Sequence, residues 1–138
     1  MKGEQGQAFV ELLVVFTLLS LVIAGVLFFG QVLYAKLAVS VASYDGARAA
    51  VEALHKGTGV RQGQQPAELT LTGFHVDPSP AQVSVYATSG WGRGEDVVCT
   101  VSYNLSLAGL PFVSNFFPAS FPVGSRTALR VETFRSDR

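Results

Sequence analysis

The chain has 138 residues, enough for one small domain. It is unusually hydrophobic for such a domain, because 49% of its residues are hydrophobic and only 14% are charged. Ten basic and ten acidic residues give a formal net charge of zero. The arginines are scattered and form no basic stripe with interleaved aromatic residues, which argues against nucleic-acid binding. The single cysteine, Cys99, excludes an internal disulfide and is interpreted as a small buried hydrophobe.

The hydrophobic residues are concentrated near the N-terminus. The segment Leu12 to Gly30 contains no charged residue, and only Thr17 and Ser20 carry polar side chains in it. A helix needs roughly 20 apolar residues to cross a hydrocarbon core of about 30 Å. The segment is therefore predicted to be a membrane span, or to begin as one.

Two ordinary interpretations explain this N-terminus incompletely. A secretory signal peptide has a shorter apolar stretch and a basic start, whereas here Lys2 is offset by Glu4 and the small residues 40–42 come late. A plain membrane anchor explains the length of the span but gives no reason for Glu11. An acid near the end of a span can still reach the interface, so this interpretation stays open.

A third interpretation uses the spacing between Gly6 and Glu11, which lie five residues apart at the edge of the apolar run. This pattern resembles the prepilin-peptidase site of type IV pilin-like proteins. The resemblance implies cleavage after Gly6 and a new α-amine on Gln7. A carboxylate buried among packed helices needs a cationic partner. The amine of a neighbouring subunit could pair with Glu11 and set the axial register.

Two further segments, 29–36 (FGQVLYAK) and 42–48 (ASYDGAR), follow the span. Together with residues 6–11 (GQAFVE), they resemble the TadE-like pseudopilins of the tight-adherence (Tad) pilus machinery. The family-like element at the end of this region is Gly46, Ala47 and Arg48. The resemblance covers about the first 50 residues, and the remainder matches only in outline.

The resemblance implies a structural subunit, not an enzyme, that prepilin peptidase cleaves and inner-membrane machinery assembles with other pilin-like subunits. It implies a single-pass inner-membrane protein with an extracytoplasmic C-terminal domain that later reaches the pilus or cell surface, where it serves adhesion or secretion as a minor component. The lipid bilayer would hold it before assembly. The alternative is a permanently anchored extracytoplasmic binding domain.

Helical periodicity continues past the span and predicts one helix over 7–56, about 75 Å long, after a leader at 1–6. One stripe of larger residues is expected to pack on the protein's own sheet. It comprises Leu33, Leu37, Val41, Tyr44, Val51 and Leu54. A second stripe of small residues is expected to admit neighbouring helices of a filament, although alanine also simply favours helix. It comprises Ala35, Ala38, Ala42, Gly46, Ala49 and Ala53.

Four charged residues lie three or four positions apart along this helix, namely Asp45, Arg48, Glu52 and Lys56. The spacing predicts a ladder of surface ion pairs, each contributing a few tenths of a kcal/mol.

The remaining chain is expected to form a linker over 57–65 and a β domain over 66–138, so the whole is an α+β, pilin-like fold. Four strands are predicted for an antiparallel sheet with one buried face. Their markers are Leu69 and Leu71; Val83 and Val85; the alternating set from Val97 to Leu107; and Leu129 and Val131 within Ser125–Phe134.

An apolar, proline-containing connection spans Ala108 to Gly124. It is interpreted either as a lid on the domain's own core or as a patch for neighbouring subunits or the membrane surface. The patch residues are Leu110, Phe112, Phe116, Phe117 and Phe121.

No residues suggest catalysis, a cofactor or a metal. His55 and His75 are isolated and are interpreted as surface residues, and Cys99 has no CxxC partner. Residues 90–94 (GWGRG) are read as a turn, because a phosphate loop would need a helix after them.

Overall fold

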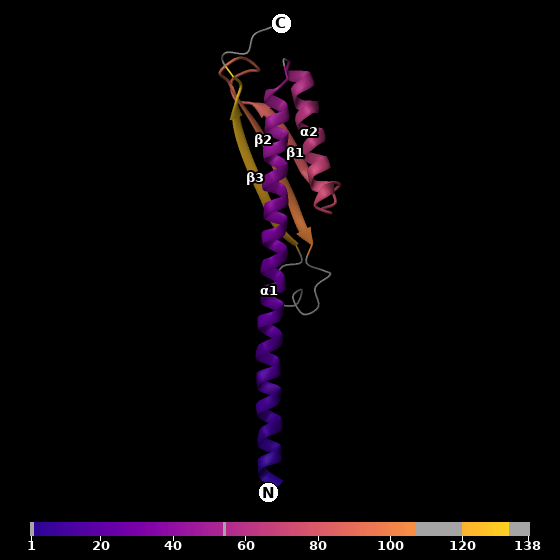
Figure 1. Cartoon of the computed structure of the whole chain (residues 1–138), viewed down its shortest axis with the longest axis vertical. Helices are drawn as coiled ribbons and strands as arrows, with labels where there is room; N and C mark the ends of the chain where they lie inside the picture. The colour runs from indigo at the N-terminus through magenta and orange to yellow at the C-terminus, as the bar shows by residue number, and fades with distance from the viewer. Residues whose placement is uncertain (1, 54, 107–119, 133–138) are drawn as a thin grey trace.

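The computed structural model of the chain describes residues 2–53, 55–106 and 120–132. These residues form two helices, α1 (Lys2–Val51) and α2 (Lys56–Gly73), and three strands, β1 (Gln82–Ala87), β2 (Asp96–Ser106) and β3 (Ser120–Arg130). The strands make one antiparallel sheet in the order β1-β2-β3. Both helices pack on the same face of this sheet through one shared core. Figure 1 shows the N-terminal half of α1 projecting alone beyond the domain, while its C-terminal half runs along the sheet beside α2.

The long helix is present, but its limits differ from the predicted ones. It begins at Lys2 and ends at Val51, whereas the expected helix covered 7–56. The chain leaves α1 through a turn in which the amide of Ala53 donates to the carbonyl of Ala50 at 3.2 Å. The indole N–H of Trp91 donates to the Ala53 carbonyl at 3.4 Å, which gives this end of the helix a partner for an otherwise free acceptor.

The largest correction concerns residues 56–73, which form α2 instead of a linker followed by a strand. Leu69 and Leu71, the predicted markers of a strand, both lie in this helix. Leu71 is fully buried and Leu69 is 65% exposed, so the two point to opposite sides of α2. The sheet therefore has three strands and not four.

A face of small residues explains why this glycine-rich segment is helical. The buried residues of α2 recur every fourth position and are Gly59, Gly63, Ala67 and Leu71. A glycine in a helix interior costs about 1 kcal/mol relative to alanine. Here the cost is offset because the small face lets α2 approach α1 closely, as the short separations at Gly46 and Gly63 show.

The other three strands agree with the alternating sequence pattern in outline. Val83 and Val85 lie in β1, and β2 contains the alternation that begins at Val97. The register pairs Val85 with Cys99, and Cys99 with Thr127. The last strand is β3, which begins at Ser120 instead of Ser125 and ends at Arg130. Leu107 and Phe134 lie outside the described residues.

The two stripes of α1 have exchanged the places that we expected for them. Leu33, Leu37 and Tyr44 were predicted to face the sheet, but they are 67%, 53% and 49% exposed. The stripe of small residues faces the sheet and α2 instead. Its buried members are Ala35, Ala38, Ala42, Gly46 and Ala53, while Ala49 is half-buried. Val41 and Val51 are also half-buried, and Leu54 lies outside the described residues.

The physical reason for this exchange is the close crossing of α1 and α2. A Cβ added at Gly46 would lie 2.7 Å from the Cys99 sulfur and 2.8 Å from the Gly63 carbonyl oxygen. A Cβ added at Gly63 would in turn lie 2.8 Å from the Gly46 carbonyl oxygen. Both separations are too short for real Cβ atoms, so only glycine fits at the two positions. The helix partner that the small stripe predicted is α2 of the same chain.

Polar contacts tie α1 to the sheet within this apolar core. The hydroxyl of Ser43, which is fully buried, lies 2.8 Å from the Thr127 hydroxyl and donates to the Ser40 carbonyl or the Ser125 hydroxyl at 2.9 and 3.1 Å. Its hydrogen-bonding capacity is therefore satisfied despite burial. Since Thr127 and Ser125 both lie in β3, this cluster fixes the register between α1 and that strand.

Candidate assembly and membrane segment

The expected processing site lies on the part of α1 that projects from the domain (Figure 1). Gly6, Gln7 and Glu11 are all exposed, and a Cβ added at Gly6 would meet no atom within 4 Å. This arrangement leaves the segment open to an enzyme or to another chain.

One helix among the described residues, Gly6–Val51, is long and apolar enough to cross a membrane, judged by length and composition. Its apolar side chains are bare along the first half: Phe9 is 61% exposed, Leu18 61% and Leu27 54%. A surface of this size and polarity is rare on soluble monomers and marks contact with lipid or with other protein. The structure is compatible with single-pass anchoring through this segment.

The first buried residue along the described part of α1 is Phe28, with Ala24 and Gly25 half-buried one turn before it. Its side chain is 8% exposed, and Leu105 at the end of β2 packs against it together with Ala24 and Val32. The domain thus meets α1 inside the apolar run, three residues before Gln31. The bare half of α1 and the packed half are separated at this level.

An apolar stripe continues along the outer side of α1 beyond this level. Leu33, Leu37 and Tyr44 point away from the sheet and from α2, as their exposure shows. Residues spaced three, four or seven apart share one face of a helix. The stripe therefore forms a surface continuous with the bare span, and it is available to a second helix.

The family-like element combines packing and surface roles. Gly46 and Ala47 are buried at the crossing with α2 and the sheet. Arg48 is exposed and forms a 4.0 Å ion pair with Glu52, of the kind that contributes little to stability. Asp45 accepts a 2.7 Å hydrogen bond from the Thr70 hydroxyl of α2. The predicted four-member ladder is thus reduced to the Arg48–Glu52 pair, and Asp45 joins the two helices instead.

The aromatic residue of the 90–94 turn has a packing role that the sequence analysis did not foresee. The Trp91 ring fills the space beside Gly59, where a Cβ would come within 1.9 Å of a ring carbon. With its hydrogen bond to the Ala53 carbonyl, Trp91 holds the junction between α1 and α2. Its sequence signal was the lone tryptophan of the chain between flanking glycines.

The remaining predicted site residues are the apolar patch between β2 and β3 and the two histidines. Phe121 at the start of β3 is 39% exposed, while Leu110, Phe112, Phe116 and Phe117 lie outside the described residues. Both His55 and His75 are exposed. Within the described ranges, no three His, Cys, Asp or Glu side chains gather as a metal site would require.

Cys99 lies fully buried at the centre of the sheet, beneath the crossing of the helices. Burial raises the pKa of its thiol to about 11, because the charged thiolate is disfavoured away from water. Since the thiolate is the reactive form, this cysteine is chemically quiet in the folded chain.

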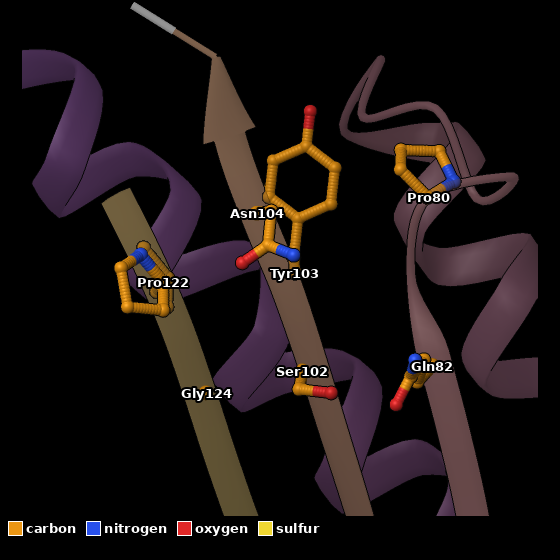
Figure 2. Close-up of a pocket in the computed structure, with 8 residues that line it drawn as sticks. Pro80, Gln82, Ser102, Tyr103, Asn104, Pro122 and Gly124 are labelled. Carbon is orange, nitrogen blue, oxygen red and sulfur yellow. The ribbon is translucent and has the colours of Figure 1, made fainter. Parts of the chain in front are cut away.

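A hollow of about 230 Å³ opens near the end of the sheet where Ser106 of β2 pairs with Ser120 of β3. Figure 2 shows Tyr103 and Asn104 of β2 between Pro122 of β3 and Pro80, with Gln82 of β1 below. The volume is below the roughly 300–1,000 Å³ of typical small-molecule sites. The hollow is therefore too small for a ligand of that class.

Taken together, these features define a class of protein in which one long apolar N-terminal helix is joined to a small α+β domain that covers only its second half. The family model described as TadE-like protein matches residues 6–48, nearly the whole of α1. This confirms the resemblance seen in residues 6–11, 29–36 and 42–48. Over most of α1 the chain is similar to the TadE-like family, and this similarity indicates an association with the Tad pilus. No curated protein and no solved structure matches the chain.

Proposed function

We propose that the protein is a pilin-like (pseudopilin) subunit of a Tad-type pilus or secretion machine. In this proposal prepilin peptidase cleaves after Gly6, the bilayer holds α1 until assembly, and the machinery then moves the subunit into the pilus as a minor component. The observation that carries the proposal is the coincidence of three boundaries. The TadE-like match, the uncovered half of α1 and the Gly6–Glu11 motif all begin at the same end of the chain.

Glu11 has a defined role in this proposal. It is the first charge at the N-terminal edge of the apolar run, and the next one along the chain is Lys36. When bare helices pack together, the Glu11 carboxylate loses water and needs a cation. The α-amine that cleavage creates on Gln7 of a neighbouring subunit supplies that cation, which sets the axial register between the two helices.

The exposed stripe of α1 supports contact with neighbouring subunits beyond the membrane. Leu33, Leu37 and Tyr44 continue the apolar surface of the span along the outside of the domain. The small-residue stripe that we first assigned to this contact is already occupied by α2 and the sheet. The proposed subunit interface is therefore the stripe of larger residues.

The first test is the N-terminal sequence of the mature protein purified from producing cells. We expect the sequence to begin at Gln7, and Gly6→Leu should block processing because the peptidase recognises the small residue before the cleaved bond. Gly3→Leu is the matched control and should be processed normally. Mature protein that retains Met1 would exclude processing and favour a permanently anchored binding domain.

The second test separates assembly from insertion. Glu11→Ala should enter the membrane as well as the wild type or better, because a charge near the apolar segment has been removed. It should nevertheless fail to enter pili, since the register contact is lost. Tyr44→Ser should reduce assembly through the outer stripe while the isolated subunit stays folded. Pili that form normally with Glu11→Ala would refute the register role.

A further inference from the structure

The domain reaches down α1 into the apolar run itself. Leu105 in β2 packs on Phe28, and the pair of Ser106 and Ser120 closes the described sheet at the same end. In Figure 1 the lower tips of β2 and β3 lie beside α1 where the bare half begins. No stretch of bare polar helix separates the apolar span from the sheet.

The length of α1 below this contact equals the thickness of a membrane. Residues 7–27 would extend about 31 Å as a helix, against roughly 30 Å for the hydrocarbon core. If the core instead begins just after Glu11, about 20 residues are needed and it ends near Gln31. In the first register the Phe28–Leu105 contact lies at the boundary of the core, and in the second it lies just inside.

Among the described residues around this level, several exposed side chains are of the kinds found at a membrane interface. Leu33 is 67% exposed, Tyr34 49% and Phe121 39%. No charged residue occurs from Leu12 until Lys36. Exposed aromatic rings with a lysine beyond them are characteristic of side chains at the level of lipid headgroups.

Polar tips in this region are held by the domain. The Tyr34 hydroxyl donates to the Phe74 carbonyl at 2.9 Å, and the two rings pack edge to face with centroids 5.8 Å apart. The Lys36 ammonium donates to the Gly124 carbonyl. These contacts fix the end of the domain against α1, so its depth follows the depth of the helix.

The opposite end of the sheet is chemically different. Its exposed or half-exposed charged residues include Arg93, Glu95, Asp96, Arg130 and Glu132. The end next to the bare half of α1 has fewer charged residues among those described, namely Lys36 and Asp77, which is exposed in the turn after α2. The contrast makes this end the one better suited to lipid.

From these observations we propose that the end of the domain next to the bare half of α1 rests in the interfacial layer of the bilayer, with Leu33 and Phe121 in contact with lipid. The occupant of this surface is the membrane that holds α1, so the inference rests on the membrane insertion in the proposed function. Extraction of the subunit then has to break lipid contacts of the domain as well as those of the helix.

The test uses the full chain in phosphatidylcholine–phosphatidylglycerol vesicles, in a Cys99→Ala background. Single cysteines are introduced as Phe121→Cys and, for the control, Ala128→Cys, and each is labelled with bimane. Both positions are exposed on β3, and they lie about 23 Å apart along the strand. Lipids with a spin label near the headgroup should quench bimane at 121 several-fold more than at 128, and aqueous iodide should show the reverse order. Equal quenching by the lipids would overturn the proposal.

A second pair on α1 guards against local disturbance by the Phe121 substitution. Leu33→Cys and Tyr44→Cys are both exposed and lie about 16 Å apart along the helix. We expect lipid quenching at 33 and none at 44. Leu19→Cys tests insertion itself. A contrary outcome is that lipids labelled deep in the acyl chain quench bimane at position 19 while lipids labelled near the headgroup quench it at neither 33 nor 121. In that case the domain lies outside the membrane, and only this inference fails. If 19 is not quenched, insertion and the proposed function fail with it.

Discussion

The crossing of Gly46 and Gly63 can be tested by adding a single methyl group. In Gly63→Ala the new Cβ would lie 2.8 Å from the Gly46 carbonyl oxygen, 3.0 Å from the Ala50 Cβ and 3.1 Å from a methyl group of Val85. The first of these atoms belongs to the backbone, so the two helices have to separate by several tenths of an ångström. Such overpacking costs typically 1–3 kcal/mol, against a gain of about 1 kcal/mol in helix propensity, which already includes the lower conformational entropy of the unfolded chain.

Because three neighbours have to move together, we expect the overpacking to exceed the gains, with a net loss of about 1 kcal/mol in the free energy of unfolding. Gly57→Ala is the matched control. It lies in the same helix, and an added Cβ would meet no atom within 4 Å. We expect it to be neutral or to stabilise the chain by up to about 1 kcal/mol.

Urea unfolding of the full chain in detergent micelles, followed by tryptophan fluorescence, measures this difference. The probe is well placed, because Trp91 packs at the junction of α1 and α2. A Gly63→Ala variant that is as stable as the Gly57→Ala variant would show that the two helices do not depend on this close approach, and the argument for glycine at the crossing would be wrong.

Three further predictions follow from the same core. Leu37→Ser should leave the free energy of unfolding within about 0.5 kcal/mol of the wild type, because Leu37 is exposed. Ala38→Leu at the next position should lower it by about 1–3 kcal/mol, because Ala38 is fully buried. Urea unfolding of the two variants checks which stripe of α1 faces the sheet. Trp91→Ala should cost about 2–3 kcal/mol, below the range for a fully buried tryptophan because the Trp91 side chain is half-buried. Circular dichroism measures this loss, and increased hydrogen exchange at the start of α2 should accompany it. For Cys99, the pKa raised to about 11 favours the neutral thiol in the folded state, so its contribution to the free energy of unfolding is fully present below the pKa of the unfolded thiol and is lost as the pH rises from about 9 towards 11. Over this range the free energy of unfolding should fall by up to about 2–3 kcal/mol more for the wild type than for Cys99→Ala. Equal losses in the two proteins would contradict the burial argument.

Several features of this protein follow from its sequence alone, because each depends on local physical chemistry. A charge-free run from Leu12 to Gly30 can be little other than an apolar helix, and α1 contains it. Alternation from Val97 onwards predicts a half-buried strand, and β2 begins at Asp96. The TadE-like segment was also recognisable, since each of its three motifs is a short run of consecutive residues, and the family match confirms it over residues 6–48.

The second helix was missed because its signals are weak within the segment itself. Residues 56–73 include four glycines and Pro66, a composition that normally argues against helix. The stability of α2 comes from packing against α1 and β1. Small residues recur at every fourth position in Gly59, Gly63 and Ala67. This spacing indicates a helix only when a second surface is present to pack against it, and the residues of that surface are far away in the sequence.

The proposed processing motif and the apolar run of span length are thus properties of a continuous stretch of residues, and the sequence by itself determines where they are. The assignment of faces on α1 could be decided only by the tertiary structure. Periodicity shows that α1 has one stripe of small residues and one of large residues, but burial depends on what the rest of the chain brings to each. Here α2 and the sheet approach so closely that only the small stripe, centred on Gly46, can accept them. Leu33, Leu37 and Tyr44 are left outside for that steric reason.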